Sequence, residues 1–326
     1  MPKPKVLATH ELFDAARQIL EEACEVEYWA KPELIPKDEL WRRIQDKEGL
    51  VSLLTVRVNE ELLRAAPKLR IVANVAVGFD NIDVPACTAR KVLATNTPGV
   101  LDETTADFAW TLMMAVARRL GEGEVLARSG NWKNWDLAQL VGTDVHGKTL
   151  GIVGFGRIGK AMARRARGFN MKVIYNSSKR APEEVEKELC AEYRELNALL
   201  SEADFVTLHV PLNEDTRGLF GTAKLHRMKP TAFLINTARG PVVDEAALVY
   251  ALESGKIAGA GLDVYENEPF ILPGLKRANV VLAPHMGSAS LETRTKMAVM
   301  AAENTAAFFK GQKAPNMLNP EVVQAK

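Results

Sequence analysis

Three residues in the second half of the chain carry side chains suited to chemistry on a small acid: Arg239, Glu268 and His285. A guanidinium binds a carboxylate through a planar fork, and a histidine can donate a proton near neutral pH. A carboxylate beside that histidine would orient the imidazole and favour its charged form. The trio therefore predicts a catalytic site in which Arg239 binds a 2-oxo acid while Glu268 and His285 form the acid–base pair for its reduction.

Each of these residues comes at or just after the end of an expected strand. Ligands of doubly wound sheets bind at the carboxyl ends of the parallel strands, so three such ends would bring the side chains together. Taken singly, each residue would ordinarily be a surface charge or a loop residue. The prediction therefore depends on their shared position.

The elements that would position the trio alternate along the chain. Short β-rich runs are separated by runs with helical spacing, which predicts parallel βαβ units with helices on both faces of each sheet. Strands are expected at residues 5–9, 49–55, 69–77, 92–96, 149–154, 172–176, 205–210, 232–236, 259–264 and 280–283. Helices are expected at 11–22, 59–66, 102–120, 160–167 and 291–310, with an irregular segment at 121–146. The last six strands form one continuous segment and would complete a dinucleotide-binding sheet.

A glycine-rich loop lies between an expected strand and an expected helix. Its sequence is Gly154-Phe155-Gly156-Arg157-Ile158-Gly159. In this pattern the first glycine permits a tight turn, the second lets the backbone approach a pyrophosphate, and the third lets the helix pack on the strand. The alternative is a glycine-rich turn without a ligand. The flanking strand and helix favour the phosphate-binding interpretation.

The end of the next strand bears on the choice of cofactor. NAD-specific enzymes usually place an acid here to bind the adenosine ribose hydroxyls. This chain has Asn176, followed by Ser177, Ser178, Lys179 and Arg180. Hydroxyls and cations can bind a 2′-phosphate that an acid would repel. We therefore expect NADPH to be preferred, with NADH still possible; the alternative is a solvated turn whose Lys179 and Arg180 face water.

Composition excludes several classes of protein. A chain of 326 residues is expected to form two domains. A formal charge of +1 does not suggest nucleic acid or an anionic membrane as a partner, and no apolar run is long enough for a membrane span. The start of the chain lacks the apolar region of a signal peptide, and three scattered cysteines suit a reducing compartment, so a cytoplasmic location is expected. The histidines show no metal-ligand spacing, so no metal is expected.

Together these motifs resemble the D-isomer-specific 2-hydroxyacid dehydrogenase family. The matching blocks are residues 75–83, 96–99, 154–159, 209–212, 236–240, 261–264, 268–269 and 284–285. They cover nearly the whole chain in the family's order. Residues 142–153 and 168–171 resemble most closely the glyoxylate/hydroxypyruvate reductases of the 2-ketogluconate reductase type.

The resemblance implies an α/β protein with two doubly wound parallel-sheet domains. A Rossmann cofactor domain at 99–288 would be inserted into a flavodoxin-like substrate domain formed by 1–98 and 289–326, with hinges near Pro98 and Ser288. The helix from Asp102 would be the family's dimer arm, so a homodimer is expected, and Met113 and Val116 on that helix would face either the partner or the core.

The resemblance also implies roles for individual residues. Arg239 would hold the substrate, and His285, paired with Glu268, would protonate the carbonyl oxygen. Val77 and Gly78 would hold the substrate carboxylate through their amides, and Leu53, Thr55 and Trp135 are candidates for the pocket lining. The remaining implied cofactor contacts are Val210, Pro211, Thr216, Thr237, Ala238, Asp263 and Gly287.

Two alternatives stay open at this stage. The first is a reductase of larger sugar acids such as 2-ketogluconate, since the sequence does not define the size of the pocket. The second is a dinucleotide-sensing, corepressor-like protein without turnover, although the chain shows no basic patch to support that role. Glu268 argues against the formate-oxidising branch of the family, which has an amide in that role.

Overall fold

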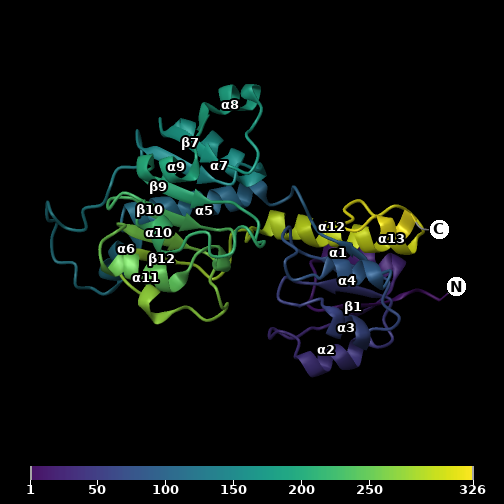
Figure 1. The fold of residues 1–326 in the computed structure, drawn as a ribbon. Helices are drawn as coiled ribbons and strands as arrows, with labels where there is room; N and C mark the ends of the chain where they lie inside the picture. Colours follow the sequence, from purple (N-terminus) through teal and green to yellow (C-terminus); the bar gives the residue numbers. More distant parts are fainter. Residues whose placement is uncertain (1, 325–326) are drawn as a thin grey trace. The chain divides into compact units, whose positions relative to one another are not determined.

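A computed structural model describes residues 2–324, and the chain divides into two compact units (Figure 1). The first combines the residues up to Leu101 with those from Ala289 onward, and the second runs from Asp102 to Ser288. Each unit contains one sheet in which all the strands are parallel. The molecule is therefore built from two doubly wound α/β units, which confirms the expected fold class.

The first unit has a five-stranded sheet in the order β2-β1-β3-β4-β5, which is the flavodoxin-like order. Helix α12 packs against α1 and β4 of this unit, and Figure 1 shows it in yellow beside α1. Its elements are β1 (Lys5–Ala8), α1 (Asp14–Ala23), β2 (Glu25–Tyr28), α2 (Lys37–Ile44), β3 (Gly49–Ser52), α3 (Glu60–Ala65), β4 (Ile71–Asn74), α4 (Val84–Ala89), β5 (Leu93–Thr95), α12 (Leu291–Phe309) and α13 (Glu321–Gln324).

The second unit has a seven-stranded sheet in the order β12-β11-β10-β9-β6-β7-β8. Counted from β6, this is the Rossmann order with one additional strand. Its elements are α5 (Asp102–Ala117), α6 (Leu120–Arg128), β6 (Thr149–Val153), α7 (Arg157–Gly168), β7 (Lys172–Asn176), α8 (Glu183–Leu189), β8 (Ala191–Tyr193), α9 (Leu196–Glu202), β9 (Phe205–Leu208), α10 (Thr222–Leu225), β10 (Phe233–Asn236), η1 (Gly240–Val242), α11 (Glu245–Glu253), β11 (Gly259–Leu262), η2 (Pro273–Leu275) and β12 (Val280–Leu282).

The structure adds elements that the sequence did not predict, among them the helices α2, α4, α8, α9, α10, α11 and α13. The cofactor sheet has seven strands rather than six, because β8 was not predicted, and β2 of the first sheet was also missed. Both are short edge strands with glutamate in their sequence, and edge strands often carry charge instead of a clean apolar alternation. Residues expected to be irregular from 121 include most of α6, whose two glycines weaken the helical signal.

Helix α5 belongs to the core of its own unit. It packs against α7, β10 and β11, and Met113 and Val116 are 0% and 4% exposed. Both side chains are therefore packed inside their own unit. Of the two positions expected for Met113 and Val116, facing a partner or facing the core, the structure shows the core. None of the described helices is long and apolar enough to cross a membrane.

Candidate active site

The glycine-rich loop joins β6 to α7 in a conformation that requires glycine. Gly154 has φ +95°, and a Cβ on it would lie 2.5 Å from the carbonyl oxygen of His209. A Cβ on Gly159 would lie 2.2 Å from the carbonyl oxygen of Gly154, so the helix can pack against the strand only without a side chain there. Gly156 is the N-cap of α7, and no side chain caps this N-terminus. Free amides and a positive helix end suit a pyrophosphate.

The other residues of the loop have supporting contacts. Phe155 is buried and stacks on Tyr175 with ring centroids 3.9 Å apart, and Ile158 packs partly buried against the same core. The Arg157 guanidinium makes an ion pair of 3.0 Å with Asp102. These side chains therefore hold the loop in place, while its backbone amides remain the groups suited to bind phosphate.

The end of β7 places the residues predicted to select the cofactor in one turn. The Asn176 side chain donates to the carbonyl of Arg194 at 2.8 Å, so it braces the turn. Ser178 and Lys179 are exposed, and Lys179 makes no ion pair with any residue of the range 2–324. Arg180 differs, because its Nε and Nη2 both donate to the Glu186 carboxylate at 2.9 Å.

Glu186 also accepts a hydrogen bond of 2.5 Å from the hydroxyl of the buried Tyr175. The hydrogen bonds from Arg180 and Tyr175 lower the pKa of Glu186 to about 2. The same ion pair raises the pKa of Arg180, so both groups stay charged across the physiological range. Arg180 is therefore a neutralised cation, and Lys179 is the cation of this turn whose charge is not offset by a partner.

The predicted catalytic residues follow three neighbouring strands of one sheet. Arg239 comes after β10, Glu268 after β11 and His285 after β12. The Nδ1 atom of His285 lies 2.7 Å from Oε2 of Glu268, and these side chains are 28% and 31% exposed. The other Glu268 oxygen accepts a hydrogen bond of 3.0 Å from the backbone amide of Tyr265. The structure therefore forms the pair that the sequence predicted.

Arg239 is half-buried at the start of η1, where its Nη1 donates to the carbonyl of Ala238 at 2.8 Å. Asn236 holds this turn by donating to the Arg239 carbonyl and accepting from the Ala238 amide, both at 3.0 Å. Burial alone would raise the pKa of Glu268, but the hydrogen bond from His285 and the charges of His285 and Arg239 bring it below its ordinary value. Glu268 is therefore a carboxylate at neutral pH.

Asp263 fixes the loop that carries His285. Its carboxylate accepts hydrogen bonds of 2.7 Å from the amides of Met286 and Gly287, and its carbonyl accepts one of 2.9 Å from the His285 amide. These bonds hold His285 at φ +53°, a left-handed conformation that few side chains adopt. Burial raises the pKa of Asp263 more than the two amides lower it.

A family model described as "D-isomer specific 2-hydroxyacid dehydrogenase, NAD binding domain" matches residues 110–287, which include the glycine loop and all three catalytic candidates. The chain belongs to this family. The dehydrogenase is therefore an oxidoreductase with a nicotinamide dinucleotide cofactor, and the family resemblance inferred from its motifs is confirmed.

Known relatives and solved structures are similar to the dehydrogenase over nearly its full length. Glyoxylate reductase of Korarchaeum cryptofilum is 53% identical over 99% of this chain and 98% of its own. Glyoxylate reductase of Thermococcus kodakarensis is 50% identical over the same shares. An NADPH-dependent glyoxylate/hydroxypyruvate reductase of Sinorhizobium meliloti, solved with NADP and malonate, has a TM-score of 0.85 at 33% identity and covers 98% of this chain and 97% of its own.

The remaining predicted cofactor contacts of the dehydrogenase lie on loops at the ends of β9, β10 and β12. Thr237 is buried, and its hydroxyl has no hydrogen-bond partner within residues 2–324, which suits a position facing a bound ligand. Ala238 and Val210 are half-buried, whereas Pro211 is exposed. The Thr216 hydroxyl donates to the Pro211 carbonyl at 2.6 Å, so it is engaged in closing a turn.

The predicted substrate-binding residues of the first unit lie after β3 and β4. The carbonyls of Val77 and Gly78 accept hydrogen bonds from the side chains of Asn96 and Asn74, at 2.7 and 3.0 Å. Their amides donate to no described residue, so they are available to bind a carboxylate. Leu53 is half-buried and Thr55 is exposed. Trp135, in the second unit, is 75% exposed.

Sequence reasoning missed Tyr265, Glu245 and Glu266, which support the catalytic loops. The Tyr265 hydroxyl donates to the Ala283 carbonyl at 2.9 Å, and its amide is the donor to Glu268. A backbone amide carries no sequence signal for the side chain it will bind. These contacts therefore emerge only from the folded structure.

Proposed function

We propose that the dehydrogenase is an NADPH-preferring reductase that converts glyoxylate and hydroxypyruvate to their 2-hydroxy acids. The observation that carries the proposal is the 2.7 Å contact between His285 and Glu268, beside an arginine whose charge reaches Glu268. This arrangement supplies a proton donor and a carboxylate binder on one sheet edge. The names of the relatives support the choice of substrate.

The proposed mechanism assigns one task to each side chain. The Arg239 guanidinium binds the carboxylate of the 2-oxo acid. The Nδ1 atom of His285 is engaged by Glu268, so Nε2 is the atom that donates the proton to the carbonyl oxygen. The hydride would come from the nicotinamide of a bound cofactor. The charge of Glu268 stabilises the imidazolium before transfer, and Asp263 keeps the histidine loop in position.

The cofactor preference rests on the turn after β7. It offers the hydroxyls of Ser177 and Ser178 and the charge of Lys179, and Asn176 stands where an acid would favour NAD. Arg180 contributes less than its charge suggests because Glu186 neutralises it. The Sinorhizobium meliloti relative, named as NADPH-dependent, supports the same preference.

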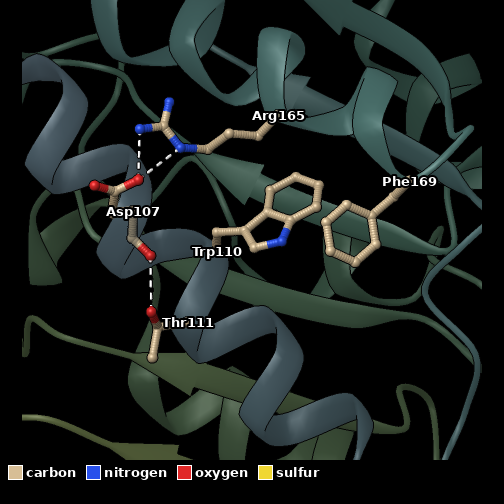
Figure 2. Close-up of a pocket in the computed structure, with 5 residues that line it drawn as sticks. All are labelled: Asp107, Trp110, Thr111, Arg165 and Phe169. Atoms are coloured by element: carbon tan, nitrogen blue, oxygen red, sulfur yellow. Dashed lines mark hydrogen bonds and ion pairs between the residues drawn. The ribbon is translucent and has the colours of Figure 1, made fainter.

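We also propose that a second copy of the chain covers part of the second unit. A surface pocket of about 420 Å³ opens between α5 and α7, where Trp110 faces Phe169 and Arg165 binds Asp107 (Figure 2). The same unit exposes a set of large apolar side chains after α5: Leu120, Val125, Trp132, Trp135, Leu137 and Val141. Such a concentration of exposed apolar groups is typical of a protein interface.

The test of the function is a substrate panel with purified protein. Glyoxylate, hydroxypyruvate and 2-ketogluconate are each supplied with NADPH and with NADH, and oxidation of the reduced cofactor is followed by absorbance. We expect the two small acids to be reduced with the higher kcat/KM. Faster turnover of 2-ketogluconate would favour the sugar-acid alternative, and cofactor binding without turnover of any acid would favour the sensor alternative.

A further inference from the structure

Two glutamates outside the catalytic trio hold each other's backbone. The carboxylate of Glu245 accepts a hydrogen bond of 2.8 Å from the amide of Glu266. In return, the carboxylate of Glu266 accepts one of 3.0 Å from the amide of Glu245. Glu245 is 6% exposed, whereas Glu266 is exposed. The pair therefore joins two loops through one buried and one solvated carboxyl group.

These loops carry two of the proposed catalytic residues. Glu245 begins α11, which follows the Arg239 turn and η1, and Glu266 lies two residues before Glu268. The backbones of the loops are in direct contact, because a Cβ on Gly240 would lie 1.9 Å from the carbonyl of Tyr265. The reciprocal hydrogen bonds therefore join the loop after β10 to the loop after β11. At this place the two backbones are too close for a side chain to fit between them.

The segment held by Glu245 is also the one that orients Glu268. Glu245 binds the Glu266 amide, and the preceding amide, that of Tyr265, donates to Oε1 of Glu268. The other oxygen of Glu268 contacts His285. Tyr265 also donates through its hydroxyl to Ala283, two residues before His285. A displacement of this segment would change the position of Glu268 relative to His285.

The buried position of Glu245 is energetically costly for a carboxyl group. It makes no ion pair with any cation among residues 2–324, and its neighbours include the carboxylates of Glu266 and Glu268. Burial and these charges raise its pKa. A buried carboxyl group is tolerated when hydrogen bonds satisfy it, and here that donor is the Glu266 amide.

We propose that Glu245 is a positioning residue, whose carboxyl oxygen fixes the Tyr265–Glu266 segment and so keeps Glu268 aimed at His285. The inference rests on the proposed roles of Glu268 and His285. Loss of this alignment should affect proton transfer rather than cofactor binding, because Glu268 and His285 form the acid–base pair. Misplacement of a catalytic group by about 1 Å costs up to about 100-fold in rate.

The test compares three variants at Glu245. Glu245→Gln keeps an oxygen acceptor for the Glu266 amide and should retain kcat within about twofold of the original enzyme. Glu245→Ala removes the acceptor, and Glu245→Asp keeps the charge but shortens its reach. Both should lower kcat about tenfold, shift the alkaline limb of the kcat profile to lower pH, and leave the KM for NADPH unchanged.

Two controls separate positioning from general destabilisation. Glu253→Ala changes an exposed glutamate on the same helix, which pairs with Arg277, and should leave kcat and the pH profile unchanged. Glu266→Ala removes only the acceptor for the Glu245 amide and should reduce kcat less than Glu245→Ala does. The melting temperature of every variant is measured; a loss of kcat with an unmoved pH limb would indicate only a structural role.

The inference is overturned if Glu245→Asp and Glu245→Ala keep normal kcat and pH profiles, or if Glu245→Gln is as impaired as Glu245→Ala. Should the alanine variant not fold, the comparison of the Asp and Gln variants decides. His285→Ala is assayed in parallel: normal turnover by that variant would contradict the proposed function itself, whereas its failure beside a normal Glu245→Ala enzyme would contradict only the role of Glu245.

Discussion

The guanidinium of Arg180 is bound on two of its nitrogens by the carboxylate of Glu186, each at 2.9 Å. The Arg180 side chain lies at 65% exposure, but Glu186 is only 11% exposed and is held in addition by Tyr175. The sequence suggested that both Lys179 and Arg180 could bind a 2′-phosphate. The structure makes them unequal, because a phosphate that approaches Arg180 meets a neutral pair, whereas one that approaches Lys179 meets an unbalanced positive charge.

The first prediction concerns this inequality. The unchanged enzyme should prefer NADPH over NADH by about tenfold or more in kcat/KM, and Lys179→Ala should reduce that preference about fivefold. Arg180→Ala should reduce it less, and the double variant should raise the KM for NADPH while leaving NADH nearly unchanged. Steady-state kinetics with both cofactors measures this, with Lys187→Ala, an exposed lysine paired with Glu183, as the matched control.

Added salt gives a second reading of the same prediction. Because the discriminating charge is exposed, rising ionic strength should weaken NADPH binding more than NADH binding. Equal use of the two cofactors by the unchanged enzyme would show that the turn after β7 only faces solvent.

The second prediction concerns the guanidinium of Arg239. Arg239→Lys keeps the charge but loses the planar fork, so binding of the transition state should weaken. We expect a loss of about 2–4 kcal/mol, calculated from the ratio of the kcat/KM values of the two enzymes. Cofactor affinity should change much less. Kinetics with glyoxylate measures the effect, and Arg277→Lys, which changes an arginine paired with Glu253 on the surface, is the control. Near-normal efficiency of Arg239→Lys would remove Arg239 from the active site.

The third prediction follows from the lowered pKa of Glu268. Because its pKa is lowered, Glu268 carries a negative charge at every pH above that pKa. It loses this charge only as the pH falls through the lowered pKa. At neutral and alkaline pH it therefore stabilises the imidazolium that reduction needs. Glu268→Gln removes that charge, so the alkaline limb of the reduction profile should move to lower pH by about one unit. An unmoved limb would show that the limb reports another group.

Glu253→Gln is the control for this measurement. It neutralises a glutamate of the same unit that pairs with Arg277 instead of a histidine. Its pH profile of reduction should match that of the unchanged enzyme. A matching shift in both variants would point to a general effect of charge on the protein.

The fourth prediction concerns assembly. Sedimentation at micromolar concentration should show a dimer, and replacing Trp132 and Trp135 by serine should weaken it by about tenfold or more in Kd. These residues replace Met113 and Val116 as the expected contacts, since the latter are buried in their own unit. Leu34→Ser changes an exposed leucine of the first unit and should leave the dimer intact. A monomer at every concentration would contradict the proposal.

Sequence predicted those parts of the fold that local pattern controls. Strand β7 has the expected bounds, and Asn59 caps α3 by accepting from the Leu62 amide at 3.1 Å. The strand-end positions of Arg239, Glu268 and His285 followed from the same pattern. Buried parallel strands and capped helices leave such signals because each is a continuous apolar or periodic run.

Tertiary pairing was beyond the reach of that pattern. Glu186 lies on a helix whose orientation the sequence does not specify, so its ion pair with Arg180 was not predicted. The contact between Glu245 and Glu266 joins residues far apart in the chain through backbone amides, which carry no residue-specific signal. The roles of the catalytic and cofactor-binding residues remain predictions, although the geometry that they need is present.

Helix α12 belongs to the first unit but is synthesised after the whole of the second unit. It packs on α1 and β4, and Asn319 beyond it accepts a hydrogen bond of 2.8 Å from the Ala94 amide at the sheet edge. All residues of the second unit therefore leave the ribosome before α12 does. Only then can Ala298, Ala301 and Ala302 of α12 pack into the core of the first unit. During synthesis the unit that begins the chain is therefore the last to be completed, and the apolar face that α12 covers stays open until then.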